Sequence, residues 1–106
     1  MDDITEKFLE DTLNEIEEMY NNDEFRDGYA EAVELLKNSI IRFYEDIKPE
    51  LDCKVLEFDP DYDGVVDILE NIGEEIKGRT IDNYFTTSWN NSYFIIFLLK
   101  KEANND

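Results

Sequence analysis

The sequence predicts a small α+β protein whose helices and strands follow one another in the order α-α-β-α-β-β. Apolar residues recur every three or four positions along three stretches, which is the helical period. Three shorter stretches carry aromatic and β-branched residues bounded by turn residues, a pattern typical of strands. We therefore expect an N-terminal helical hairpin and a third helix, packed on a three-stranded, mainly antiparallel sheet.

The chain of 106 residues is expected to form one acidic domain, 1–106, with a frayed tail over 102–106. Its residues are 42% hydrophobic and 13% aromatic. Disordered acidic segments are poor in aromatic residues, so this composition favours a folded core despite the charge.

The first helix is expected over residues 4–20, with Asp3 and Glu6 in the spacing of a capping box. Asn21 and Asn22 should end it. Its apolar residues are spaced by three and four positions: Ile4, Phe8, Leu9, Leu13, Ile16, Met19 and Tyr20.

The second helix is expected to begin near Asp23 and to end before Pro49, because the residue before a proline is pushed out of the helical conformation. Its predicted buried stripe consists of Phe25, Tyr29, Val33, Leu36, Ile40, Phe43, Tyr44 and Ile47.

The strand candidates are Cys53–Phe58, Thr80–Trp89 and Ser92–Lys100. The last two should form a hairpin around Asn90 and Asn91. Ser92–Lys100 is apolar on both faces, which is typical of a central strand covered on both sides. In Thr80–Trp89 the residues expected on one face are Ile81, Phe85, Thr87 and Trp89.

Residues 59–70 match the calcium-binding loop of an EF-hand, in which alternate oxygen ligands converge on one cation. The matching ligand positions are Asp59, Asp61, Asp63, Val65, Asp67 and Glu70. The flanking sequence does not follow the motif. Positions that are apolar in the exiting helix of an EF-hand are occupied here by Asn71, Glu74 and Glu75.

A helix over the same segment is the interpretation that we favour. Asp59 would be its N-cap and Pro60 its first residue, where the missing N–H costs nothing. Its apolar stripe would be Tyr62, Val65, Val66, Leu69, Ile72 and Ile76. No metal or cofactor is then required, and calcium remains the alternative.

The net charge is −18, from 28 acidic and 10 basic residues. Direct binding of nucleic acid needs a basic surface and is not expected, nor is binding to an anionic membrane. The chain has no His and one Cys, so it lacks the usual catalytic pairs and zinc clusters, and we do not expect an enzyme.

We expect a cytoplasmic protein. The N-terminal residues do not read as a signal peptide, and the lone Cys53 fits a reducing compartment. If the chain is encoded by a phage, this compartment is the cytoplasm of the host cell.

Acidic residues concentrate on the first and third predicted helices, and residues 1–24 and 51–77 carry net charges of −9 and −7. Carboxylates four positions apart on a helix are separated by ~6 Å along its axis, which resembles the spacing of successive phosphates. Such a surface can occupy a basic site built for DNA or RNA. The candidate contact residues are Glu10, Glu17, Asp63, Asp67, Glu70 and Glu74. The alternative is that these acidic stripes are solvated faces that confer solubility.

In size, charge and α+β character the chain resembles the small acidic proteins that phages use against host defences, including anti-restriction and anti-CRISPR proteins that mimic DNA. This resemblance implies an inhibitor that binds a basic, nucleic-acid-binding partner protein. We expect the chain to be a monomer or a small homo-oligomer. The chain also resembles immunity proteins and antitoxins that neutralise nuclease toxins. In that case Tyr20, Tyr62 or Trp89 are candidate anchors, because aromatic residues often dominate interface energies. A third hypothesis is a calcium-binding protein with a lone EF-hand-like loop.

Overall fold

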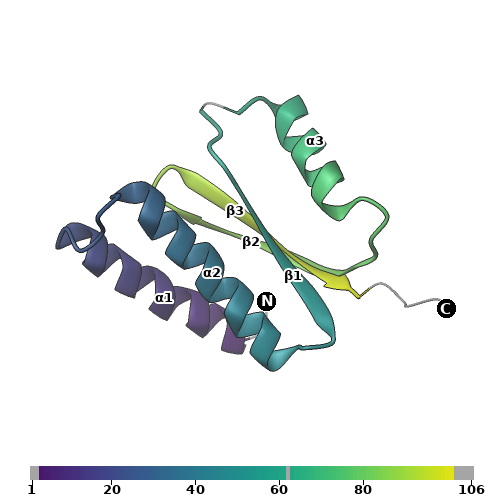
Figure 1. The fold of residues 1–106 in the computed structure, drawn as a ribbon, viewed down its shortest axis with the longest axis horizontal. Helices are drawn as coiled ribbons and strands as arrows, with labels where there is room; N and C mark the ends of the chain where they lie inside the picture. The colour runs from purple at the N-terminus through teal and green to yellow at the C-terminus, as the bar shows by residue number, and fades with distance from the viewer. Residues whose placement is uncertain (1–2, 62, 102–106) are drawn as a thin grey trace. The chain divides into compact units, whose positions relative to one another are not determined.

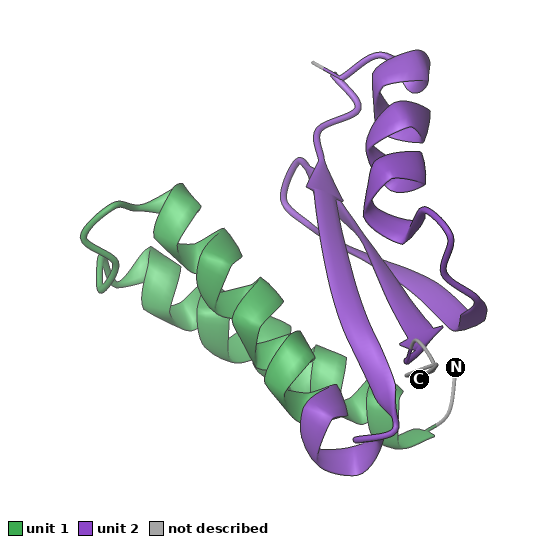
Figure 2. Ribbon diagram, turned by 45° about the vertical axis from the view of Figure 1, so that its right-hand side comes forward, with its two compact units in different colours: residues 1–43 green, residues 44–106 purple. Residues whose placement is uncertain are grey.

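The computed structural model describes residues 3–61 and 63–101, and Figure 1 shows the elements of that part of the chain. These elements are α1 (Asp3–Asn21), α2 (Tyr29–Ile47), β1 (Leu51–Phe58), α3 (Val65–Ile76), β2 (Ile81–Trp89) and β3 (Ser92–Lys100). The predicted α+β class and the order α-α-β-α-β-β are confirmed. The tail expected over 102–106 lies outside the described residues. The chain divides into two compact units, residues 1–43 and 44–106 (Figure 2).

The first unit contains α1 and most of α2, which lie side by side as a helical hairpin (Figures 1 and 2). The ring of Phe8 stacks on that of Phe43 with centroids 3.9 Å apart. Tyr20 meets Tyr29 edge to face at 6.1 Å, next to the connection. Apolar residues at helical spacing are buried on both helices: Leu9, Ile16, Ala32, Val33, Leu36 and Ile40.

The ends of these helices differ in part from the prediction. α2 begins at Tyr29 rather than near Asp23, so Phe25 lies in the connection. Asp23 (φ 55°) and Gly28 (φ 61°) are in the left-handed region, which interrupts a right-handed helix. Asp3 is a residue of α1, so its predicted role as the cap is wrong. Asn21 ends α1, and α2 ends two residues before Pro49, as expected.

The second unit is built on an antiparallel sheet with the strand order β1-β3-β2. The prediction that Ser92–Lys100 is the central strand is confirmed. Trp89 pairs with Ser92, so Asn90 and Asn91 form the predicted turn. Asn90 (φ 55°) adopts the left-handed conformation that short hairpin turns need and that Asn tolerates.

The strand register divides the sheet residues between two faces, because side chains of directly paired residues point the same way. One face, here called the Phe94 face, contains Phe94, Ile96, Leu98, Cys53, Val55, Phe85 and Thr87. The other, here called the Tyr93 face, contains Tyr93, Ile95, Phe97, Leu99, Asp52, Lys54, Leu56, Phe58, Tyr84, Thr86 and Ser88.

Each face is approached by a helical segment of the same unit. The last turn of α2 places Tyr44 over the Phe94 face, with its ring 5.5 Å from that of Phe85. α3 lies beside β1 on the Tyr93 face, where Glu75 is 3.9 Å from Lys54.

A register shift between Ile81 and Asn83 changes the start of β2. Ile81 pairs with Leu99 and therefore lies on the Tyr93 face, whereas Phe85 pairs with Ile96 on the opposite face. The prediction that Ile81 and Phe85 share a face is wrong, because the extra residue of a β-bulge reverses the alternation of side chains.

Candidate protein-binding surface

α3 begins at Val65, with Gly64 as its N-cap, and no side chain caps it. The prediction that Asp59 caps this helix and Pro60 opens it is wrong. The N–H of Asp59 donates to Oδ2 of Asp63 at 2.8 Å, and the N–H of Asp61 donates to Oδ1 of Asp59 at 2.9 Å. Asp side chains that bond nearby backbone groups in this way stabilise turns in competition with helix. Residues 59–61, 63 and 64 are therefore not helical and precede α3.

The same hydrogen bonds bear on the calcium alternative. Carboxylate oxygens of Asp59 and Asp63 accept hydrogen bonds from backbone N–H groups. The element before this segment is the strand β1, whereas an EF-hand loop follows a helix. Among residues 3–61 and 63–101, no group of three or more His, Cys, Asp or Glu side chains is placed to hold a metal ion. The described geometry gives the calcium interpretation no support.

α3 leaves much of its apolar surface uncovered. Ile68, Ile72 and Ile76 are half-buried, and no residue of the helix is fully buried. Val65 is 73% exposed and Leu69 61% exposed, and Val66 is exposed too. The predicted stripe is thus only partly the packed face, and its first member, Tyr62, lies outside the described residues. The packed stripe includes Ile68 and is displaced around the helix from Val66 and Leu69.

Three carboxylates lie on the side of α3 next to Val66, which is four positions before Glu70. Asp67, Glu70 and Glu74 follow one another at spacings of three and four, so they share one face of α3 and all are exposed. α3 contains no basic residue, and none of the three forms an ion pair with a described residue. We call this combined feature the α3 surface: Val65, Val66, Asp67, Leu69, Glu70 and Glu74.

The other predicted contact residues lie elsewhere. Asp63 is exposed but precedes α3, so the predicted four-carboxylate stripe on one helix is wrong at that position. Glu10 and Glu17 lie on α1, in the first unit, and are two helical turns apart on one side of that helix. Glu10 is exposed and Glu17 is half-buried.

The predicted aromatic anchors do not form an exposed set. Trp89 is buried, Tyr20 is half-buried against Tyr29, and Tyr62 lies outside the described residues. The sequence reasoning missed the exposed aromatic residues, Tyr84 and Tyr93, which share the Tyr93 face. The alternation of Tyr84 with Thr86 and Ser88 is the signal that could have found the first of them.

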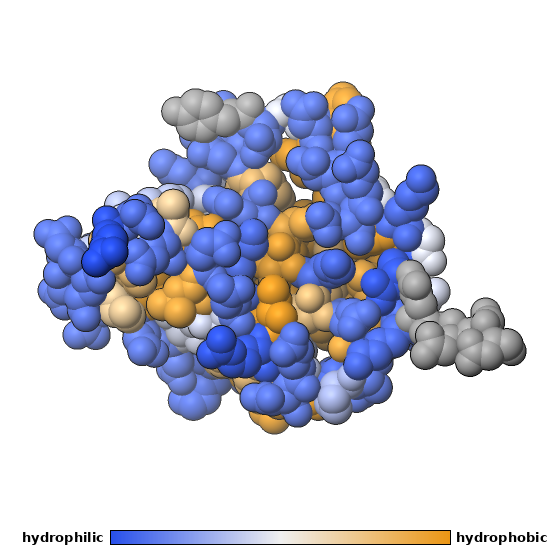
Figure 3. All heavy atoms as spheres, viewed as in Figure 1, coloured by the Kyte–Doolittle hydropathy of each residue, from blue (hydrophilic) through white to orange (hydrophobic). Residues whose placement is uncertain are grey.

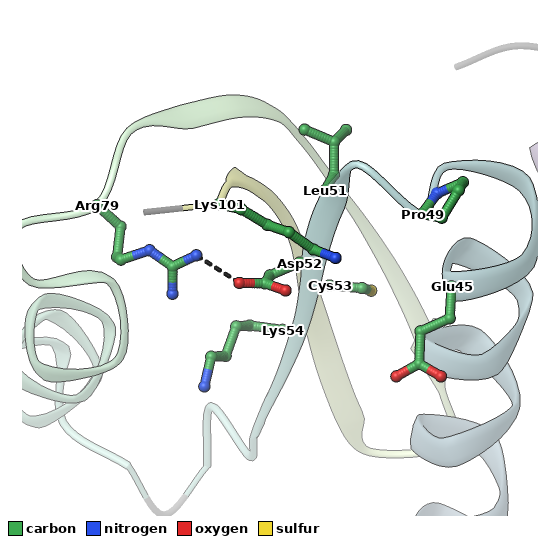
Figure 4. Close-up of a pocket in the computed structure, with 8 residues that line it drawn as sticks. All are labelled: Glu45, Pro49, Leu51, Asp52, Cys53, Lys54, Arg79 and Lys101. Carbon is green, nitrogen blue, oxygen red and sulfur yellow. Dashed lines mark hydrogen bonds and ion pairs between the residues drawn. The ribbon is translucent and has the colours of Figure 1, made fainter. Parts of the chain in front are cut away.

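A pocket of about 470 Å³ lies beside β1 and was also missed (Figure 4). Its lining residues come from separate segments of the second unit: Glu45, Pro49, Leu51, Asp52, Cys53, Lys54, Arg79 and Lys101. Arg79 Nη2 donates to Asp52 Oδ2 at 2.6 Å and to the Lys100 carbonyl oxygen at 3.1 Å. Acidic and basic groups are mixed in this pocket, so it does not continue the acidic α3 surface.

The pocket does not supply a reactive thiol. Burial, and secondarily the nearby Glu45 carboxylate, raise the pKa of Cys53 to about 12. The thiolate is the nucleophilic form of cysteine, and a pKa this high keeps Cys53 neutral at physiological pH.

Comparisons with protein-family models, with curated proteins and with solved structures give no match. Among the described residues, no helix combines the length and apolar character needed to cross a membrane.

Proposed function

We propose that this protein binds a basic surface on a partner protein and thereby occupies a site that holds DNA or RNA. The α3 surface carries the proposal. It presents Asp67, Glu70 and Glu74 without a basic neighbour on the helix, next to apolar side chains that the sheet does not cover. A face made only for solubility has no use for exposed Val66 beside Glu70, or for exposed Leu69 beside Val66.

The geometry of the carboxylates supports competition with phosphates. Glu70 and Glu74 are separated by one helical turn, ~6 Å along the axis. Lys and Arg side chains that line a nucleic-acid site can pair with carboxylates at this spacing, and the net charge of −18 accelerates the encounter. In this proposal the protein is a cytoplasmic inhibitor. It binds a nucleic-acid-binding enzyme, such as a restriction or CRISPR nuclease, and performs no catalysis itself.

The test is a comparison of two variants that lose the same number of charges. The first removes the carboxylates of α3: Asp67→Asn, Glu70→Gln and Glu74→Gln. The matched control removes three exposed carboxylates elsewhere: Glu24→Gln, Asp46→Asn and Glu50→Gln. Each protein is immobilised and exposed to bacterial lysate at low salt, then eluted with duplex DNA and with a salt step.

We expect the unmodified protein and the control variant to retain nucleic-acid-binding proteins that duplex DNA releases. The α3 variant should retain far less of them, because its loss of charge is at the binding surface. Equal retention by the two variants would contradict the role of α3. Bound proteins that resist elution by nucleic acid and by salt would contradict the mimicry of phosphates.

A dedicated toxin is the second candidate partner, and the exposed apolar part of the α3 surface favours it. Phosphate mimicry needs charge alone, whereas a single cognate protein also offers apolar contacts that dominate affinity. Leu69→Ser should then abolish capture of one particular protein while the carboxylates are intact. If the protein instead inhibits by charge, this variant should lose little binding.

A further inference from the structure

β2 has an open backbone edge. The N–H of Lys100 in β3 donates to the carbonyl oxygen of Thr80 at 2.9 Å, so the backbone groups of even-numbered β3 residues face β2. Their partners in β2 are Asn83, Phe85 and Thr87. The intervening residues Tyr84, Thr86 and Ser88 therefore direct their backbone N–H and C=O groups away from the sheet. The N–H of Tyr84 donates to its neighbour Asn83 Oδ1 at 2.8 Å, in agreement with this orientation.

From Asn83 to Ser88 this edge lacks the charges that normally protect one, and Asp82, the charged residue of β2, lies at the bulge before that stretch. The 17 residues from Asn83 to Leu99 contain no Asp, Glu, Lys or Arg, in a chain that is 36% charged. Proteins guard free edges with Lys, Pro or inward-pointing charges, since an unguarded edge pairs with another strand. Tyr84, Thr86 and Ser88 are all exposed, Tyr84 to 62%.

The opposite edge of the sheet is guarded. β1 carries the charged residues Asp52, Lys54 and Glu57, and α3 lies alongside it on the Tyr93 face (Figure 1). Arg79 and Lys101 add further charge next to this strand, as Figure 4 shows. In the described part of the chain, only the stretch of β2 from Asn83 to Ser88 therefore offers an unguarded edge to another strand.

We propose that β2 is the interface of a homodimer, in which the β2 strands of two copies pair antiparallel and join their sheets into one. A second copy is the occupant that the charges favour. Two chains of net charge −18 repel each other, and repulsion is least where the uncharged segment 83–99 meets itself. Antiparallel pairing of one strand with its own copy is a two-fold contact, and the guarded β1 edge stops further growth.

The test is the solution mass of the full chain and two Thr86 variants, by sedimentation equilibrium. The unmodified protein should have twice the monomer mass. Thr86→Pro should have the monomer mass, because it removes an outward N–H and leaves the ladder to β3 intact. Thr86→Val keeps the N–H and the branched side chain, so it should remain a dimer.

Thr86→Lys provides a second variant in case the proline unfolds the strand, which circular dichroism would reveal. Lysine lowers the net negative charge, so loss of the dimer in this variant cannot come from added repulsion between acidic surfaces. Added salt should strengthen the dimer by screening the two chains, whereas it should weaken the proposed binding of a basic partner.

The inference is overturned if the unmodified protein is a monomer at both low and high salt. It is also overturned if Thr86→Lys and a folded Thr86→Pro both dimerise like the unmodified protein, or if assembly continues beyond two copies.

Discussion

At the scale of single residues, Arg79 joins segments that are distant in the sequence. Its side chain is 13% exposed, and its guanidinium donates to Asp52 of β1 and to the carbonyl oxygen of Lys100 at the end of β3. Charge-assisted hydrogen bonds from the planar guanidinium group are stronger than hydrogen bonds between neutral groups, and burial reduces their screening by water. The contact therefore ties the connection after α3 to one end of the β1–β3 ladder, where Leu51 pairs with Lys100 and Asp52 with Leu99.

We expect Arg79→Ala to lower the free energy of unfolding by about 1–2 kcal/mol, less than most charged hydrogen bonds contribute, because Asp52 is half-exposed and water screens the pair. Urea denaturation measures this loss. Lys7→Ala is the matched control, since Lys7 pairs with Asp11 in full exposure to solvent and should change the midpoint little. Equal effects of the two substitutions would contradict a structural role for Arg79.

The thiol of Cys53 should react slowly with thiol reagents in the folded protein. Its raised pKa, about 12, keeps it protonated, so a thiol reagent at mildly alkaline pH should label it much more slowly than in denaturant. The neutral thiol also contributes stability that is fully present below its ordinary pKa of 9.0 and is lost as the pH rises toward 12. Labelling at the same rate in the folded and the denatured protein would show that the thiol is not protected.

At the scale of elements, one glycine inside α3 and one just after it test how this helix is built. Gly73 lies inside the helix, and an added Cβ there would meet no atom within 4 Å. Gly78 follows the helix with φ +73°, a conformation that L side chains rarely adopt.

We expect Gly73→Ala to stabilise the protein by about 0.5–1 kcal/mol, because it removes the entropic cost of glycine in a helix. Gly78→Ala should destabilise it, since Ala is strained in the left-handed conformation. Thermal unfolding of the two variants gives the comparison. The same sign for both would contradict the placement of Gly73 inside α3 and of Gly78 after its end.

α3 also shows where sequence reasoning succeeds and where it fails. Helical and strand periods were enough to predict the order of the elements and the central place of β3. The start of α3 was wrong, because local side-chain bonds of Asp59 and Asp63 outcompete the helix and periodicity does not report them. The exposure of Leu69 was also missed, since a sequence shows that a residue is apolar but not whether the fold covers it. Asp67, Glu70 and Glu74, by contrast, were correctly placed on one exposed helical face.

At the scale of the whole molecule, the charge is shared equally. Residues 1–43 contain 13 acidic and 4 basic residues, and residues 44–106 contain 15 and 6, so each unit carries −9. Within each unit, ion pairs such as Lys7 with Asp11 and Lys54 with Glu75 neutralise few of the carboxylates. Repulsion within each unit therefore opposes its folding.

Added salt should raise the thermal midpoint by several degrees. Each like-charge pair on a helix costs about 0.2–0.5 kcal/mol, and screening reduces this cost. A change of about 1 kcal/mol in a domain of this size corresponds to a shift of roughly 4–8 °C. The measurement is made on Thr86→Pro, so that dimer formation does not contribute. A midpoint that does not rise with salt would contradict self-repulsion as a major cost of folding.

The strand order β1-β3-β2 has a consequence for synthesis on the ribosome. β1 and β2 both pair with β3 and not with each other, yet β3 is the last of the three strands to be translated. α1 and α2 make local contacts and can form while the chain is still growing. The sheet cannot form before β3 has been synthesised, and until then the nascent β1 and β2 have no native partner strand in their own chain. Slow translation through β3 would therefore prolong the stage at which this protein is most exposed to chaperones and proteases.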